Sequence, residues 1–228
     1  MNKAIIIGRL GQEANFRSGG EQSACRFMLV VNESWKNKNG EQKEHTEWIN
    51  VMAVGSVADQ MKAAPKGALV IVQWASHTGT YEKEGEPIYY FEILAKKIGI
   101  VKEVAHTKIT DLDQNEVSLI GRLGQDPMTP TEEITHFSMA CNEYQRGEEI
   151  VQWINVATFN GLAENAAKFL KKGRLVYVEG RVRTRKYDKD GQIRYATGIV
   201  AHRWQALDAK PKAQEMGSLD DWDPEVPF

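Results

Sequence analysis

The chain has 228 residues, 42% of them hydrophobic and 26% charged, a composition typical of soluble globular proteins with one or two domains. No apolar run is long enough to cross a membrane, and the N-terminus lacks the apolar stretch of a signal peptide, so we expect a cytoplasmic protein. The net charge is −2 and the chain has two cysteines, Cys25 and Cys141, whose wide separation argues against a disulfide framework or a metal site.

The sequence contains an internal duplication. Three segments of the first half return in the same order in the second half: residues 7–12 as 120–125, residues 48–51 as 153–156, and residues 67–97 as 173–203 without a gap. We therefore predict two copies of one domain, residues 1–101 and 117–207. The polar residues 102–116 are predicted to be a linker, and residues 208–228, with six acidic and two basic side chains, a disordered acidic tail.

Each copy is predicted to be mainly β-structure. In the first copy the strands lead into a short helix near residues 56–63, which Pro65 and Gly67 end. The elements of the second copy are strands at 117–123, 134–142 and 150–159, a helix at 161–171, a long strand at 175–187, a turn at 188–191 and a returning strand at 193–204. This is the element order of an OB barrel. The predicted fold is all-β with one short helix per domain, two tandem five-stranded OB-fold barrels plus a disordered acidic C-terminal tail.

A basic hairpin in the second copy is the first candidate site. Side chains alternate along a strand, so three arginines and one tyrosine share a face, with a lysine near the tip and another arginine on the return strand. These residues are Arg181, Arg183, Arg185, Tyr187, Lys186 and Arg194. Arginines on one face repel one another unless a polyanion lies between them, and the ring offers a stacking surface for a base. The pattern indicates single-strand binding; the alternative is a solvated hairpin whose charges protect a strand edge from aggregation.

Aromatic side chains form the second candidate site. Trp153 and Phe159 share a strand face, and the polar Asn155 between them indicates that this face points outward rather than into the barrel core, which is the alternative. Tyr144 lies in the preceding hairpin region.

The first copy keeps only part of these sites. It retains aromatic residues at Trp35, Trp48 and Tyr81, but Val54 stands where the second copy has Phe159. Residues 75–80 (Ala-Ser-His-Thr-Gly-Thr) replace the whole basic strand. We therefore expect the first domain to bind phosphates more weakly than the second.

The C-terminal tip is the third candidate site. Four carboxylates, Asp220, Asp221, Asp223 and Glu225, precede the apolar end Val226, Pro227 and Phe228. Such a segment suits capture by a basic rim around an apolar pocket on a partner protein. The alternative is a tail that only confers solubility, but such a tail has no need of a terminal aromatic ring.

No motif of catalysis or metal binding is present. The five histidines have no ligand spacing with each other or with the cysteines, and the P-loop, G-x-S-x-G and H-E-x-x-H patterns are absent from the sequence. We therefore expect no cofactor, no bound metal and no enzymatic activity.

Together these motifs resemble those of bacterial single-stranded DNA-binding protein. The resemblance rests on residues 121–124 (Gly-Arg-Leu-Gly), 142–143, 176–187 and 226–228, and on Trp153 followed by Phe159. It covers nearly the whole chain. It implies an OB fold, sequence-independent binding and protection of single-stranded DNA in replication, repair and recombination, and a C-terminal tip that recruits the enzymes of these processes. The base-stacking residues that it implies are Trp35, Trp48 and Tyr81 in the first domain and Tyr144, Trp153, Phe159 and Tyr187 in the second.

The chain also departs from the family pattern. Most members have one OB domain per chain and form tetramers, so two fused domains imply a homodimer with four barrels. Trp222 and Pro224 interrupt the acidic run of the tail, which predicts a different partner affinity or choice. Two other classes of protein stay open: an accessory protein that keeps the fold but binds mainly proteins, and an RNA-binding OB protein, because stacking does not distinguish RNA from DNA.

Overall fold

The computed structural model describes residues 1–17, 22–37, 39–83, 85–101, 112–145, 148–189 and 191–208. The first domain contains β1 (Asn2–Leu10), β2 (Asn15–Phe16), β3 (Ala24–Lys36), β4 (Gln42–Val54), α1 (Ser56–Gln60), a 3-10 turn η1 (Met61–Ala63), β5 (Leu69–Lys83) and β6 (Glu86–Val101). The second contains β7 (Gln114–Leu123), β8 (Met128–Thr131), β9 (Ile134–Gln145), β10 (Glu148–Phe159), α2 (Gly161–Phe169), β11 (Leu175–Lys189) and β12 (Gln192–Ala206). The duplication seen in the sequence is therefore also a duplication of structure.

The predicted strands and helices are present in both domains, with small differences at their ends. The short strands β2 and β8 were not predicted, because two and four residues are too few to establish an alternating pattern. β7 begins at Gln114, so its first residues fall within the predicted linker 102–116. Residues 102–111 of that linker, and the tail from residue 209 with its predicted docking tip, lie outside the described residues.

Each domain closes into an OB-type barrel, as predicted. In the first, β3, β4, β6, β5 and β1 are neighbours in that order, and β1 returns to pair with β3. The β4–β6 pairing is parallel, whereas the other pairings are antiparallel, and β10–β12 repeats this exception in the second domain. The pairs that close the barrels are Leu10 with Leu29, Val51 with Ile93, Leu123 with Met139, and Val156 with Ile199.

Strand alternation builds the core of each barrel. Every second side chain of the long strands points inward, and most of these are aliphatic. Fully buried examples are Ile6, Leu29, Ile49, Val72, Leu119, Met139, Ile154 and Val178. Cys25 and Cys141 are free, buried strand residues, and burial raises the pKa of the Cys141 thiol to about 12, so this thiol is protonated at neutral pH. Among the described residues no helix is long and apolar enough to cross a membrane.

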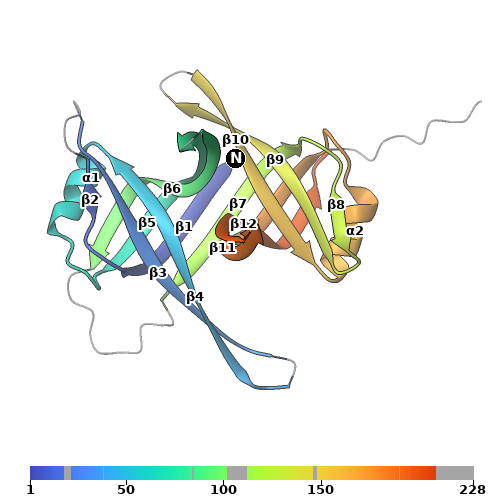
Figure 1. The fold of residues 1–228 in the computed structure, drawn as a ribbon, viewed down its shortest axis with the longest axis horizontal. Helices are drawn as coiled ribbons and strands as arrows, with labels where there is room; N and C mark the ends of the chain where they lie inside the picture. Colours follow the sequence, from blue (N-terminus) through green and yellow to red (C-terminus); the bar gives the residue numbers. More distant parts are fainter. Residues whose placement is uncertain are drawn as a thin grey trace, which may run out of the picture.

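The two barrels are joined by an antiparallel pairing of their first strands. β1 pairs with β3 at its last two residues, Arg9 and Leu10, and residues Asn2 to Ile7 of β1 pair with β7. The register runs from Asn2 opposite Leu119 to Ile7 opposite Gln114. The described strands therefore form one 12-stranded sheet, in which β1 and β7 lie side by side at the centre while the β3–β4 and β9–β10 hairpins extend in opposite directions (Figure 1).

Candidate nucleic-acid interface

The aromatic residues predicted to stack on bases, as far as the structure describes their side chains, lie on the outside of the barrels. On β10 the Trp153 side chain is 53% exposed while its neighbour Ile154 is buried, and Trp48 on β4 is 50% exposed in the same way. The prediction that Trp153 and Phe159 face outward is thus confirmed. The exposed members of the predicted set are Trp35, Trp48, Tyr81, Trp153, Phe159 and Tyr187. The side chain of Tyr144 lies outside the described part of the chain.

Glycines of the repeated Gly-Arg-Leu-Gly motif position the two tryptophans. The indole of Trp153 lies so close to Gly124 that a Cβ there would be 2.3 Å from Cζ3 of the ring. Gly11 stands in the same relation to Trp48, with a corresponding distance of 2.6 Å. A backbone without a side chain therefore forms a flat seat for each ring, which holds the ring in one orientation while its other face remains exposed.

A methyl group at Gly124 should displace the Trp153 ring. We expect Gly124→Ala to weaken binding of a dT oligomer by about 1 kcal/mol or more, approaching the loss of one stacked base. Gly99→Ala is the matched strand control, since its Cβ would meet its nearest neighbour at an ordinary 3.7 Å. Tryptophan fluorescence and a binding titration measure both effects. Unchanged affinity in Gly124→Ala would show that the orientation of this ring is unimportant.

The outer part of the basic hairpin is exposed. Arg185, Lys186 and Tyr187 follow one another along β11, and all three side chains face solvent. In the ladder with β12, Lys186 lies opposite Tyr195 and Tyr187 opposite Arg194. Cations and rings thus alternate across the two strands, an arrangement that accommodates phosphates and bases together.

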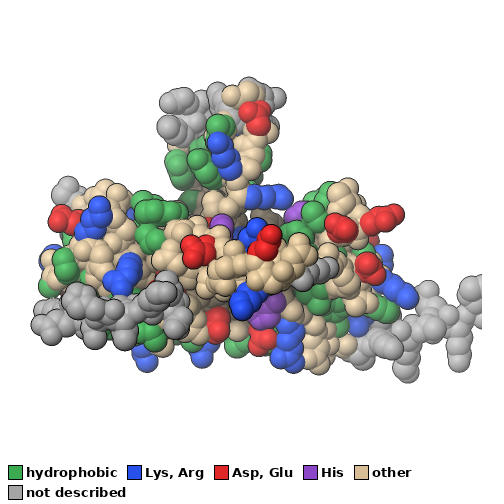
Figure 2. All heavy atoms as spheres, turned by 90° about the horizontal axis from the view of Figure 1, so that it is seen from below, with side chains coloured by type: hydrophobic (Ala, Val, Ile, Leu, Met, Phe, Trp, Pro, Cys, Tyr) green, Lys and Arg blue, Asp and Glu red, His purple; other side chains and the backbone are tan. Residues whose placement is uncertain are grey.

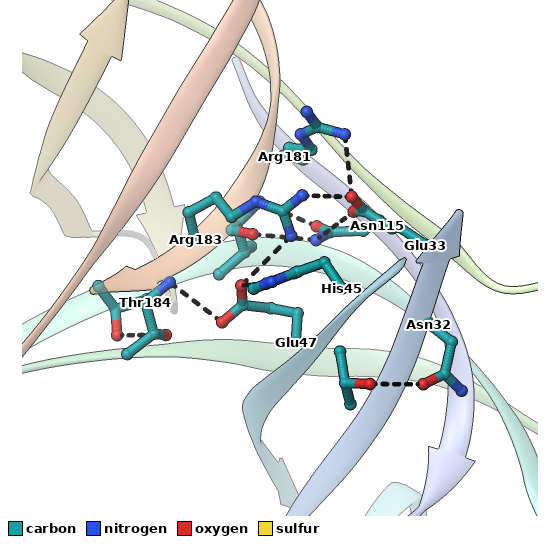
Figure 3. Close-up of polar contacts among 11 residues, drawn as sticks. Asn32, Glu33, His45, Glu47, Asn115, Arg181, Arg183 and Thr184 are labelled. Carbon is teal, nitrogen blue, oxygen red and sulfur yellow. Dashed lines mark hydrogen bonds and ion pairs between the residues drawn. The ribbon is translucent and has the colours of Figure 1, made fainter. Parts of the chain in front are cut away.

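The inner part of the same strand is engaged with the first domain. Nη1 of Arg181 donates to Oε2 of Glu33 at 2.9 Å, and Nη1 of Arg183 donates to Oε2 of Glu47 at 3.3 Å (Figure 3). Arg183 also donates to Glu33 through its other terminal nitrogen. From the sequence we expected a polyanion to relieve repulsion among the arginines. For these two, carboxylates from β3 and β4 of the first domain already do so.

Two exposed tyrosines were missed in the prediction. Tyr89 on β6 is 80% exposed and Tyr195 on β12 is 69% exposed, more than any predicted ring whose side chain the structure describes. A signal for them was present, since they occupy equivalent positions in the two copies. Tyr89 lies opposite Thr80, which directly precedes Tyr81, and Tyr195 lies opposite Lys186. Each of the two tyrosines is therefore next to a predicted site residue on its hairpin.

A groove of about 720 Å³, lined by both polar and apolar side chains, lies on the first domain. Six of its lining residues are Gln12, Asn15, Arg26, Asn50, Tyr81 and Tyr90. Arg26 is held there by the buried Glu92, which accepts from its Nε at 2.9 Å and lies 3.4 Å from Nδ1 of His77. Burial alone would raise the pKa of Glu92, but hydrogen bonds from His77 and Arg26 outweigh it and lower that pKa. Alignment of the copies could not reveal this cation, because His136 takes its place in the second.

On the face of the molecule shown in Figure 2, charge is mixed rather than segregated, because Lys and Arg side chains are interspersed with Asp and Glu. Any attraction of this face for phosphate is therefore local rather than spread over the surface. No group of three or more His, Cys, Asp or Glu residues in the described ranges could hold a metal ion.

Comparison with known families agrees with this geometry. The model of the Single-strand binding protein family matches residues 1–101 and, separately, residues 114–207. The chain belongs to this family. Members of the Single-strand binding protein family are not enzymes, in agreement with the sequence prediction. The second match includes Gln114, where β7 begins.

Individual relatives match about one domain. The single-stranded DNA-binding protein of Neisseria meningitidis serogroup A is 44% identical over 103 residues, which cover 41% of this chain and 59% of that protein. Single-stranded DNA-binding protein 2 of Streptococcus agalactiae serotype III is 40% identical over 103 residues, covering 42% of this chain and 79% of that protein. The chain thus spans only about three fifths of the Neisseria relative's length.

Solved structures extend the likeness across both domains. A deletion mutant of the single-stranded DNA binding protein from Thermus aquaticus superposes with a TM-score of 0.75, at 23% identity, over 94% of this chain and 98% of that one. The wild-type Thermus structure gives a TM-score of 0.72 at 22% identity, covering 92% and 95% of the two chains. At this identity the likeness establishes the tandem two-barrel fold alone.

Proposed function

We propose that this protein binds and protects single-stranded DNA without sequence preference, in DNA replication, repair and recombination. The observation that carries the proposal is the row of outward-facing rings on β4 and β10, with Trp48 and Trp153 each seated on a glycine. Rings stack on any base because every base has a π-face, so they provide affinity without reading sequence. Two relatives that are 44% and 40% identical to one domain carry the name single-stranded DNA-binding protein.

The second domain is proposed to be the main binding surface. It has exposed rings at Trp153, Phe159 and Tyr187, and exposed cations at Arg185 and Lys186 on the adjoining hairpin. The first domain keeps Trp48 and Tyr81 at two of these ring positions, but it has Val54 in place of Phe159 and Gly79 and Thr80 in place of the two cations. Its contribution should therefore come mainly from stacking at Trp35, Trp48 and Tyr81, aided by Arg26 in the groove.

The assembly and the partners are further parts of the proposal. A homodimer would bring together four barrels, and two-fold dimers are the commonest closed assemblies. The acidic tip at residues 220–228 is proposed to recruit replication, repair and recombination enzymes in the cytoplasm. It is not proposed to take part in DNA binding. No cofactor is invoked.

A titration of oligonucleotides tests the central claim. Affinity for a dT oligomer should far exceed affinity for a duplex of equal length, and should fall with salt with a logarithmic slope of about −0.7 per phosphate neutralised. An rU oligomer in competition tests the RNA alternative, and a flat salt response would favour the accessory-protein alternative. Equal affinity for duplex DNA would contradict the proposal.

A further inference from the structure

The ionic cluster between the two domains is built around a buried carboxylate. The Glu47 side chain is only 3% exposed, and its Oε1 accepts from the backbone nitrogen of Thr184 at 3.0 Å. Its Oε2 accepts from Arg183, and Nε2 of His45 lies 3.0 Å away (Figure 3). Arg183 itself is 17% exposed, and its terminal nitrogens both contact carboxylates of the first domain. Removing one partner from such a buried pair leaves an uncompensated charge, so the cluster resists opening.

A phosphate could reach Arg183 only by displacing these glutamates. Arg181 is more open, at 45% exposure, but it also contacts Glu33. By contrast, Arg185 is exposed and makes no ion pair with another described residue. One strand thus carries two kinds of arginine: an inner pair engaged with the first domain and an outer one facing solvent.

The opposite side of the domain interface offers a natural comparison. Gln152 occupies the position of Glu47 in the second copy, and its Oε1 accepts from the backbone nitrogen of Thr78 at 2.8 Å. Thr78 is the equivalent of Thr184, so both copies have the same side-chain clamp on the partner domain's hairpin strand. Only the clamp on the basic hairpin is ionic, because Ala75 and His77 replace the two inner arginines in the first copy.

We propose that Glu33 and Glu47 of the first domain hold Arg181 and Arg183 as positioning residues, so that the hairpin presents Arg185, Lys186 and Tyr187 to single-stranded DNA. This inference rests on the proposed function. Thr184, whose backbone is clamped by Glu47, directly precedes the three presented residues. The first domain thereby contributes to the DNA surface of the second without contacting DNA at this point. Of the three arginines on β11 that were predicted as phosphate contacts, only Arg185 keeps that role in this proposal.

The test compares Glu47→Gln, Arg183→Gln and Arg185→Gln in the full chain. Glu47→Gln reproduces the arrangement at Gln152, so the backbone clamp and the fold should be retained. We measure affinity for a dT oligomer over a salt series and check folding by thermal melting. Glu47→Gln and Arg183→Gln should each weaken binding about twofold to tenfold, as expected for directly coupled residues, and the double variant no further than either single one. Neither should change the salt slope, whereas Arg185→Gln should reduce its magnitude by about 0.7.

The sign of the Glu47→Gln effect separates the alternatives. If the glutamates merely mask phosphate contacts, Glu47→Gln strengthens binding and Arg183→Gln flattens the salt slope, which overturns the inference. Unchanged affinity in both variants also overturns it. Glu33→Gln, at the more open rim with 16% exposure, gives the same comparison if Glu47→Gln fails to fold. Failure of the proposed function appears differently, as wild-type protein that does not prefer the dT oligomer to duplex.

Discussion

Replacing Trp153 by alanine is expected to lower affinity for a dT oligomer by about 1–3 kcal/mol, the usual cost of one lost base stack. The indole is half exposed and seated on Gly124, so it is available to a base and already fixed in orientation. A preorganised ring loses little further freedom on binding, which favours the upper part of this range. Because the ring lies outside the barrel core, the change should leave the thermal unfolding midpoint nearly unaltered.

Trp48→Ala is the matched variant in the first domain. The Trp48 ring has nearly the same exposure as the Trp153 ring and also packs on a glycine. A difference in affinity between the two variants therefore reflects the residues that surround each ring. We expect a smaller loss at Trp48, since the adjoining hairpin lacks the equivalents of Arg185 and Lys186. Phe169→Ala, which removes an exposed ring on α2, controls for loss of any surface aromatic. Equal losses at Trp48 and Trp153 would show that the domains bind DNA equally.

Deleting residues 220–228 is expected to abolish capture of replication and repair enzymes from a bacterial extract while leaving the affinity for DNA intact. The segment combines four carboxylates with a terminal aromatic residue, which suits docking in an apolar pocket with a basic rim. The charges should add rate and specificity more than affinity, so Phe228→Ala alone should remove most of the capture. Pull-down with identification of the retained proteins measures this effect.

The same truncation has an expected result on DNA binding. We expect the acidic tail to compete weakly with phosphates for the basic hairpin, so its removal should leave affinity for dT unchanged or raise it slightly at low salt. Trp222→Ala, which keeps every carboxylate and the terminal Phe228, separates the two aromatic residues of the segment. A truncated chain that keeps its protein partners but no longer binds dT would reverse the roles assigned to barrel and tail.

Local periodicity was sufficient to predict the long strands, the helices and the outward direction of Trp153 and Phe159, but not the short strands β2 and β8. Alternation along residues 150–159 separates Trp153 and Phe159 from Ile154 and Val156, and the structure confirms that separation. The ordered repetition of segments, beginning with residues 7–12 at 120–125, was sufficient to predict two domains of one fold. These predictions were correct because each depends on neighbours along the chain, or on the comparison of one copy with the other.

Contacts between residues far apart in the sequence were decided only by the tertiary structure. The Arg183–Glu47 pair joins residues 136 positions apart, and Arg26 meets Glu92 across 66 positions. From the sequence, Arg183 and Arg185 are equivalent residues of one strand face. They differ because the pairing of β1 with β7 brings the carboxylates of the first domain against the inner half of β11 and leaves its outer half in solvent. A charge pattern shows which side chains need a counter-charge; only the packing of the two barrels determines whether a carboxylate or a phosphate provides it.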